Sequence, residues 1–482
     1  MDWAGLPVCL GPLGGRALVR KRLCRTEYLL PRRPAAHGSV RANHGHFRKS
    51  ATAWGSQLAG ISLALLGPTA AHAQNASTTL IPPAIAPDYR RDRNVGVLDR
   101  PHPDFDPLGY RVGSFIVNPA LTISPGFSDN VYSDNANKKS DAFVILEPFV
   151  RVGSDWSAHR VALEMAGDIR RFKQATIRNQ NGWNVAGSGR VDVSQDLIIE
   201  AQGQIGRRFE SPYSDDVVAN TRNLSSYIQS LASLKASYTA GRTRLVAGFD
   251  RSSYEFNKVT FADRPARDQR TRDRTMNRFS GIVEYALSPS ISAYGEIIVD
   301  QNNYKFLLAN GEANRDSSGY ALLGGSNFDL AGLMRGSVGV GYSTRNYKAD
   351  LYPDASGLSI QAKIEFFPSP ITTVGVAAQR QIQDAGLGGM GAYSDNRASI
   401  RIDHELLENL ILTVDADVSK RSYFESDEYT NVFSAGAAAK FQMTRSLSFG
   451  GNIRYGSSSP HGENLGNPFD EWRAIVSIRL RR

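Results

Sequence analysis

Histidines are the side chains best suited to catalysis or metal binding in the main part of this 482-residue chain. Four of the eight histidines lie within the first 73 residues, which leaves His102, His159, His404 and His461 beyond them. Their spacing matches no metal-ligand pattern. We therefore expect no metal site, no catalytic residues, no cofactor and no enzyme activity.

One histidine keeps an enzymatic alternative open. Some lipid hydrolases place a Ser–His pair at the membrane interface. His404 falls on the apolar side of its segment with Ile400 and Ile402, which would suit such a site. Because no partner residue is identifiable, we favour an interfacial histidine at a strand end. His159 stands beside a short turn and Trp156, and we interpret it as interfacial too.

Charged residues of opposite sign recur on one side of successive segments. Arg160 shares a side with Glu164, and Arg401 shares one with Asp403. Such a surface suits a water-filled interior in which the charges neutralise one another. We expect that interior to be lined by Arg160, Glu164, Asp168, Arg190, Glu200, Glu284, Glu296, Arg401, Asp403 and Asp415.

These charges alternate with apolar residues, as in β-strands whose two faces differ. The clearest case is 113–132, where Leu121, Ile123 and Phe127 alternate with small or polar residues. A strand of this length can cross a bilayer while tilted. Residues 141–155 repeat the pattern with opposite parity, and we interpret the two segments as a hairpin.

Short connections alternate with long ones between these segments. Residues 154–156 and 194–196 form short turns, whereas 210–221 and 257–275 are long and polar. This rhythm is typical of outer-membrane barrels. We predict an all-β fold, a transmembrane antiparallel up-and-down β-barrel over residues 109–482 with about 18 strands (16–18). A soluble sandwich is the alternative, but it would seldom carry so many long strands in one domain.

The N-terminus differs in composition. Residues 1–73 hold ten Lys/Arg and two Asp/Glu, so 46 basic and 45 acidic residues remain of the chain's 56 and 47. A nucleic-acid partner is therefore not expected. Both cysteines, Cys9 and Cys24, also lie there. An apolar run and the Ala71-His72-Ala73 site predict a leader and signal peptide over 1–73, and a start at Val40 would exclude 1–39. Residues 74–108 are expected to form an extended periplasmic arm, or else simple disorder.

The segment Gly113 to Ala162 resembles the Putative beta-barrel porin 2 family, of the EpsL type found in exopolysaccharide operons. The residues that carry the resemblance are Phe115, Pro119, Asp129, Asn130, Tyr132, Pro148, Asp155 and Trp156. It implies a Gram-negative outer-membrane barrel linked to polysaccharide secretion. We expect Asp129, Asn130, Asp155 and Trp156 to form turns and an interfacial aromatic rather than a sugar site.

A channel for hydrophilic carbohydrate that assists exopolysaccharide export is the favoured function. The alternatives are a rim-type lipid hydrolase and a non-conducting structural or surface-binding barrel. Expected partners are outer-membrane lipid, the outer-membrane assembly machinery, polysaccharide and periplasmic export components. The loop 257–275, with five arginines from Arg264 to Arg274, could fold inward as a constriction or be solvated at the surface.

Overall fold

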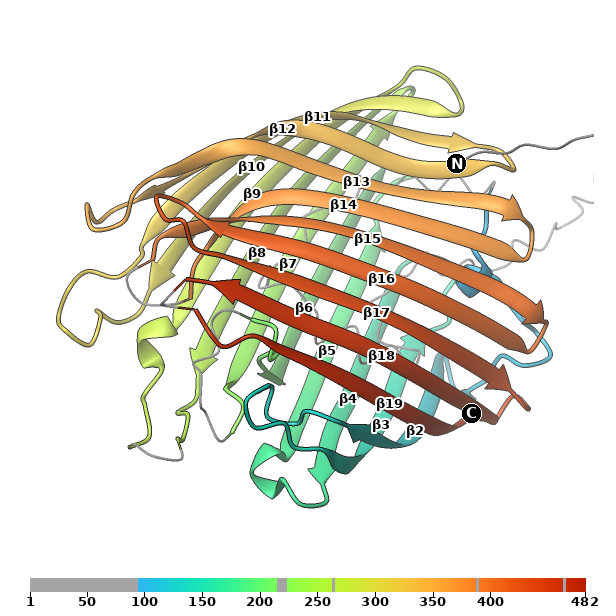
Figure 1. Ribbon diagram of the computed structural model, residues 1–482. Helices are drawn as coiled ribbons and strands as arrows, with labels where there is room; N and C mark the ends of the chain where they lie inside the picture. Colours follow the sequence, from blue (N-terminus) through green and yellow to red (C-terminus); the bar gives the residue numbers. More distant parts are fainter. Residues whose placement is uncertain (1–93, 215–222, 262–264, 387–389, 463–464) are drawn as a thin grey trace, which may run out of the picture. The chain divides into compact units, whose positions relative to one another are not determined.

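The computed structural model describes residues 94–482 except 215–222, 262–264, 387–389 and 463–464. In this part of the chain a single sheet of nineteen strands forms a closed barrel (Figure 1). Three short 3-10 helices accompany it, η1 (Val97–Asp99), η2 (Thr176–Arg178) and η3 (Arg270–Arg272). No helix among the described residues is both long and apolar enough to cross a membrane. The predicted leader (1–73) and residues 74–93 of the predicted arm lie outside the described residues.

Each strand of the barrel pairs with its neighbours in sequence, antiparallel throughout, and β19 pairs with β2 to close the ring. The short β1 (Tyr110–Val112) pairs only with β2, so eighteen strands remain in the ring and the predicted count is confirmed. They are β2 (Phe115–Ser128), β3 (Asp141–Ser154), β4 (Arg160–Phe172), β5 (Gln180–Asp192), β6 (Leu197–Phe209), β7 (Ser226–Ala240), β8 (Thr243–Phe256), β9 (Arg274–Ala286), β10 (Ile291–Tyr304), β11 (Ser317–Leu330), β12 (Met334–Tyr347), β13 (Ala355–Ser369), β14 (Thr372–Asp384), β15 (Ala392–Leu407), β16 (Leu410–Tyr423), β17 (Tyr429–Gln442), β18 (Leu447–His461) and β19 (Phe469–Arg481).

The period-2 alternation of the sequence becomes the two faces of the wall. Val476 is 60% exposed on the outer face, whereas the next residue, Ser477, is 7% exposed on the inner face. Because successive side chains on a strand point to opposite sides, a strand with this pattern can satisfy lipid on one face and a polar interior on the other. The predicted hairpin of 113–132 and 141–155 is formed by β2 and β3.

Some inward positions are apolar. Phe143, Ile145 and Ile475 form one buried cluster on the inner face, and Val246, Ile282 and Tyr294 form another. Ile475, an exception to the alternation in the sequence, is therefore explained by packing inside the barrel. The lumen is partly filled by side chains rather than uniformly polar.

The connections separate into two ends. The turns after β3, β5, β7, β9, β11, β13, β15 and β17 are short. The loops after the intervening strands are longer, except that the loop after β16 is as short as the turn after β3. The C-terminus lies at the short-turn end, as Figure 1 shows. We call the two ends of the barrel the short-turn end and the long-loop end. In outer-membrane barrels the short turns face the periplasm.

Candidate functional site

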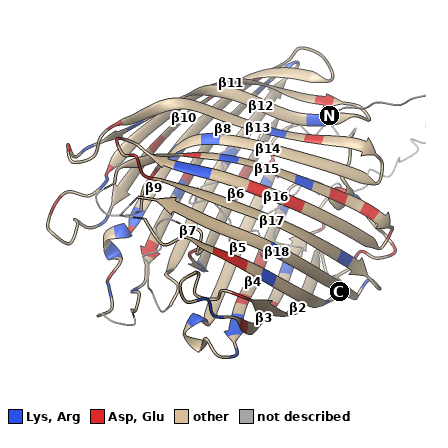
Figure 2. Cartoon of the chain, in the orientation of Figure 1, with Lys and Arg blue, Asp and Glu red and all other residues tan. Residues whose placement is uncertain are grey.

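Charged side chains on the inner face are mostly matched to a neighbour of opposite sign. Arg190 donates to Asp192 at 2.8 Å, and Arg401 lies 3.0 Å from Asp403. Charged residues of both signs occur on strands around the wall and in the loops (Figure 2). Further inward pairs are Arg151–Glu164, Lys235–Glu200, Arg244–Glu284, Arg335–Glu365, Arg345–Asp300, Arg454–Asp415 and Arg473–Glu471.

All ten residues predicted to line the interior lie on strands at inward positions, and none is exposed on the outer face. Glu284 accepts hydrogen bonds from Ser292 and Asn327, and Glu296 accepts one from Gln361 at 3.0 Å. Asp403 also accepts from Thr413. Arg160 lies opposite Arg190 on the neighbouring strand rather than next to an acid. Whether these side chains line a conducting path stays a prediction.

The long-loop end is crossed by the loop between β6 and β7. Tyr213 on this loop packs against Phe469 of β19, with ring centroids 5.0 Å apart, and against Val432 of β17. Its backbone carbonyl accepts a hydrogen bond from Arg421 of β16 at 2.8 Å. β6 and β7 lie far from β16–β19 around the ring. The described start of this loop, residues 210–214, therefore reaches across the lumen to the opposite wall.

Gly456 of β18 makes room for this contact. A Cβ at this glycine would overlap the Tyr213 hydroxyl, so a side chain there would displace the loop. The hydroxyl also hydrogen-bonds to Glu471, and burial raises the pKa of Tyr213 above its usual value. The group therefore stays a neutral hydroxyl at physiological pH and adds no charge to the narrow part of the lumen.

The loop between β8 and β9 supports the base of the crossing loop. Arg272 forms a buried ion pair with Glu210, and Gln269 donates to Ser225 at 2.8 Å. The guanidinium of Arg272 also lies 4.1 Å from the Phe256 ring centroid. From its sequence, the segment 257–275 is a candidate for a constriction. In the described part, it is the neighbouring loop that reaches the far wall, and Arg264 lies outside the described residues.

A buried network ties three strands together at the long-loop end. Arg345 of β12 lies 2.7 Å from Asp300 of β10 and 3.5 Å from Asp384 of β14. Asp384 also accepts hydrogen bonds from Asn302 and from the Tyr347 hydroxyl. Sequence reasoning missed this network. The polar parity of these positions was visible, but their meeting across several strands was not.

The short-turn end carries a strap, which we define as residues 94–106. Asn94 donates to Asp329 at 2.6 Å and accepts from the Gly332 amide at 2.9 Å. Arg335, an inward residue of β12, donates to the Asn94 carbonyl and lies 3.1 Å from Asp99. Val97 is fully buried, and its amide donates to Thr373 of β14. The strap begins on the inner face of β11–β14.

From there the strap continues along the inner rim. Arg100 lies 2.6 Å from Glu405 of β15, and Arg445, in the turn after β17, donates to the Pro103 carbonyl. Arg481 of β19 donates to the carbonyl of Phe105 at 2.9 Å. The described part of the predicted arm therefore lies against the barrel wall from β11 to β19 and narrows its short-turn end.

The residues of the family resemblance lie where the ring closes and at the turns beside it. Asn130, which has no exposed surface, donates to the Asp470 carbonyl at 2.9 Å, and Asp129 accepts from the Trp472 amide. At the other end of the same seam, the Pro119 carbonyl accepts from the Arg482 amide. These contacts hold β2 against β19.

The remaining members of the motif stabilise neighbouring turns. Trp156 packs edge-on against Phe115 at 5.7 Å, and Asp155 forms an ion pair with Arg111 of β1. Gly113 has a φ of 59°, which the tight turn between β1 and β2 requires. Tyr132 lies 5.0 Å from the Arg178 guanidinium, whose pKa burial lowers to about 10. Pro148 lies against Gly167. The interpretation of Asp155 and Trp156 as a turn and an interfacial aromatic stays a prediction.

The histidines occupy positions at the rim. The Nδ1 atom of His404 lies 3.0 Å from the Thr372 hydroxyl, which in turn accepts from Ser369. No carboxylate contact of His404 is seen within the described ranges. His159 accepts a hydrogen bond from the Asp192 amide in the turn after β3. In the part of the chain that the structure describes, no group of three or more His, Cys, Asp or Glu could hold a metal ion.

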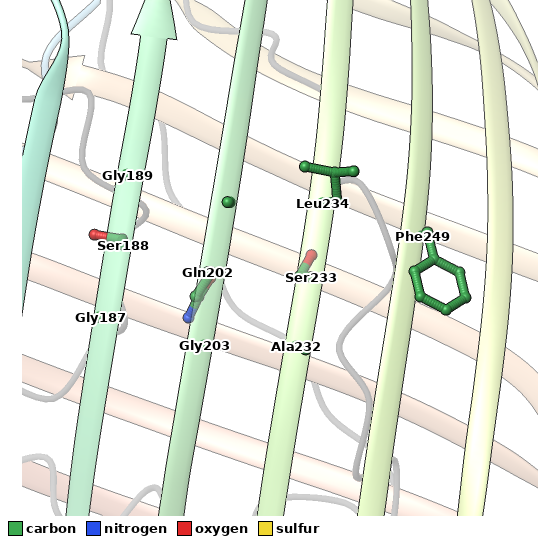
Figure 3. Close-up of a pocket in the computed structure, with 10 residues that line it drawn as sticks. Gly187, Ser188, Gly189, Gln202, Gly203, Ala232, Ser233, Leu234 and Phe249 are labelled. Atoms are coloured by element: carbon green, nitrogen blue, oxygen red, sulfur yellow. The ribbon is translucent and has the colours of Figure 1, made fainter.

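Two depressions of about 490 Å³ each lie over the outer face of β5–β11 rather than in the lumen. The first is formed by small residues of β5–β7 beside Leu234 and Phe249 (Figure 3). Their lining is predominantly apolar, as expected for a surface that meets acyl chains. Neither depression contains a constellation of polar groups that could act on a solute.

Comparisons with known proteins place the chain. A family model described as Putative beta-barrel porin 2 matches residues 102–482. No curated protein matches the chain. Among solved structures, it is similar to a BenF-like porin from Pseudomonas fluorescens Pf-5, with 11% identity, a TM-score of 0.42, and coverage of 76% of this chain and 99% of the other.

It is also similar to OccK2 (OpdF) from Pseudomonas aeruginosa, with 13% identity, a TM-score of 0.41, and coverage of 76% of this chain and 98% of the other. The copper transporter OprC shows 11% identity and a TM-score of 0.42, over 77% of this chain and 81% of the other. By the family match and its eighteen-stranded ring, the chain belongs to the Putative beta-barrel porin 2 family and is a porin-like outer-membrane β-barrel.

Proposed function

We propose that the barrel is a constricted channel through which hydrophilic carbohydrate passes, and that it assists the export of exopolysaccharide. The observation that carries this proposal is the pairing of charges along the inner wall, from Arg190–Asp192 near the short turns to Arg345–Asp300 near the long loops. A polar wall of nearly balanced charge can hydrate a sugar without binding it tightly.

The size of the ring supports the same function. About 16–18 strands leave an aqueous lumen in porins, and only inserted segments narrow it. Two such segments are present: the loop between β6 and β7 that carries Tyr213, which we call the Tyr213 loop, and the strap. Their polar contacts with the wall allow water on the remaining sides. We infer a narrow passage with weak ion selectivity rather than a wide unselective pore.

The proposal includes how the chain reaches its place. A signal peptide ending at Ala73 would be cleaved on export, so the chain from outer membranes would begin at or near Gln74. Its partners there would be outer-membrane lipid and the assembly machinery, and on the periplasmic side the components that deliver polysaccharide. N-terminal sequencing of the outer-membrane protein tests the first step, and a chain that retains Cys24 would contradict it.

Liposome swelling with the purified protein tests passage directly. Neutral sugars of increasing length should enter liposomes that contain the protein, with a size limit set by the two constrictions. In the native host, a deletion strain should secrete less polysaccharide, and the wild-type gene should restore it. Liposomes that stay impermeable to every sugar, together with unchanged secretion, would leave only a structural or surface-binding role.

A further inference from the structure

Three cations lie together on the inner wall at the short-turn end. They are Lys440 on β17 and Arg479 and Arg481 on β19. The residues next to them, Phe441 and Leu480, are exposed on the outer face, so the three charged side chains point into the lumen by strand alternation.

None of their cross-strand neighbours is acidic. Lys440 pairs with Ile411 on one side and Gly450 on the other. Arg479 pairs with Ser448 and Thr122, and Arg481 pairs with Ala120. Gly450 and Ser448 are the inward residues of β18 between the two charged strands, and both are small. The three cations therefore share one space that no bulky side chain of β18 divides.

The cations also lack the pairing seen elsewhere on the wall. The Lys440 ammonium and the Arg479 guanidinium form no hydrogen bond or ion pair with any described residue, and the Arg479 Nε atom is buried. Within the part of the chain that the structure describes, the guanidinium of Arg481 donates only to the carbonyl of Phe105 in the strap. By contrast, Lys235 and Arg190 each form an ion pair on the inner face.

Two carboxylates influence the group from a distance. Asp106 of the strap acts electrostatically on both Lys440 and Arg481, and Glu147 of β3 acts on Arg479. Neither carboxylate lies within 4.0 Å of a nitrogen of the three cations, so neither forms an ion pair with them. Three positive charges thus face two negative ones that do not contact them. The excess of donors and of charge is what an anion would satisfy.

We propose that Lys440, Arg479 and Arg481 form a binding site for oxyanions, namely carboxylate or phosphate groups carried by a solute in the lumen. A guanidinium can bind a carboxylate through two parallel hydrogen bonds, and an ammonium adds a compact charge beside it. Partial burial strengthens these interactions relative to those in bulk water. The site gives the proposed channel a preference for acidic carbohydrate, and it rests on the proposed function only in that the solute enters the lumen.

Asp106 has a defined part in this site. Its Oδ2 atom accepts a hydrogen bond from the His102 amide at 2.6 Å, which fixes the carboxylate within the strap. From there it partly neutralises Lys440 and Arg481. A solute carboxylate would compete with this charge. Removing it should therefore strengthen anion binding.

Isothermal titration of the full chain purified in detergent tests the proposal. The probes are trigalacturonate for carboxylate, inorganic phosphate for phosphate, and maltotriose as the neutral control. The double variant Lys440→Gln/Arg479→Gln keeps the Arg481 contact with the strap. Lys235→Gln, which removes a paired inward cation, is the matched control. Folding is checked by the heat-dependent shift in gel mobility.

Wild-type protein should bind at least one acidic probe and not maltotriose, and the probe that binds identifies the source of the oxyanion. The double variant should bind at least about tenfold more weakly, because it lacks two of the three charged donors that hold the oxyanion. Lys235→Gln should not change affinity, and Asp106→Asn should raise it severalfold.

Equal affinity of the wild-type chain and the double variant, or no binding of either acidic probe, would overturn the proposal. If the double variant fails to fold, the Asp106→Asn variant provides the test. An affinity for the acidic probes equal to that of the wild type would contradict the proposed oxyanion site. Sugar passage through the channel is measured separately, by liposome swelling. Binding by a protein that passes no sugar would remove the proposed function and leave the site, whereas passage without oxyanion binding would remove the site alone.

Discussion

The two ends of the lumen are narrowed by different means. At the long-loop end, Tyr213 crosses to the opposite wall, and the buried Arg345 network ties β10 to β14. At the short-turn end, the strap follows the rim through contacts such as Arg100–Glu405, and the Arg190–Asp192 pair on the wall at this end is about one-third exposed. The difference teaches that a loop of the barrel itself narrows one end, whereas a segment that precedes the barrel strands in sequence lines the other.

The largest expected effect comes from Arg345→Met at the long-loop end. The substitution leaves Asp300 and Asp384 as buried carboxylates without their cation, which should cost about 3–5 kcal/mol of unfolding free energy. Urea unfolding in lipid vesicles measures it. Arg190→Met at the short-turn end is the control, and it should cost about 0–1 kcal/mol because its ion pair is solvated. Equal losses would remove the distinction between the ends.

The wall between the two ends should show its two faces. Val476→Arg places a charge on the lipid face and should destabilise the barrel by about 2–4 kcal/mol. Ser477→Asp, one residue on, places a charge in the lumen beside Lys440 and Arg479 and should be tolerated. The same vesicle unfolding assay compares them. Similar sensitivity at both positions would indicate a two-sided protein core instead of a wall between lipid and water.

A smaller effect is expected at the strap. Asn94→Ala removes buried hydrogen bonds to Asp329 and Gly332 and should cost about 1–3 kcal/mol locally. Residues 74–482 contain no cysteine, so a single Val97→Cys substitution can report whether the strap leaves the barrel wall. It should react slowly with a maleimide in otherwise wild-type protein and much faster with Asn94→Ala added. Rapid labelling of both proteins would show that the strap does not stay on the wall.

The smallest effect is expected at the outer rim. His404→Ala removes one hydrogen bond to Thr372 and should change stability by less than about 1 kcal/mol. It should also leave lipid release from vesicles unchanged. Thr372→Ala is the paired control. Lipid release by the wild-type protein that either substitution abolishes would establish a rim hydrolase.

The ring itself could be predicted from the sequence because alternation and loop rhythm are local properties. Leu121, Ile123 and Phe127 reveal a two-sided strand without knowledge of its partners, and eighteen such strands close by pairing with their neighbours. The inward clusters could not be predicted. Ile475 and Phe143 look like errors in the pattern until β19 and β3 are brought together on either side of β2.

The contents of the lumen were not predictable either, since they depend on contacts between residues far apart in the sequence. Tyr213, in the loop after β6, and Phe469 of β19 are distant along the chain, yet their rings pack 5.0 Å apart. The strap shows no periodicity, so its path along β11–β19 leaves no signal. The ten lining residues were predicted from the alternation of the strands, but alternation says nothing about which segment narrows the space between them.

Single-channel conductance in a planar bilayer tests the central claim, that a water-filled lumen is narrowed by the Tyr213 loop. Three proteins are compared: the wild type, Gly456→Ala, and Gly451→Ala. The first substitution displaces Tyr213, and the second places a Cβ on the same strand where nothing lies within 4 Å. The wild type and Gly451→Ala should conduct equally with weak ion selectivity, and Gly456→Ala should conduct more. Silent bilayers for all three, or identical conductance of the two glycine variants, would contradict the account.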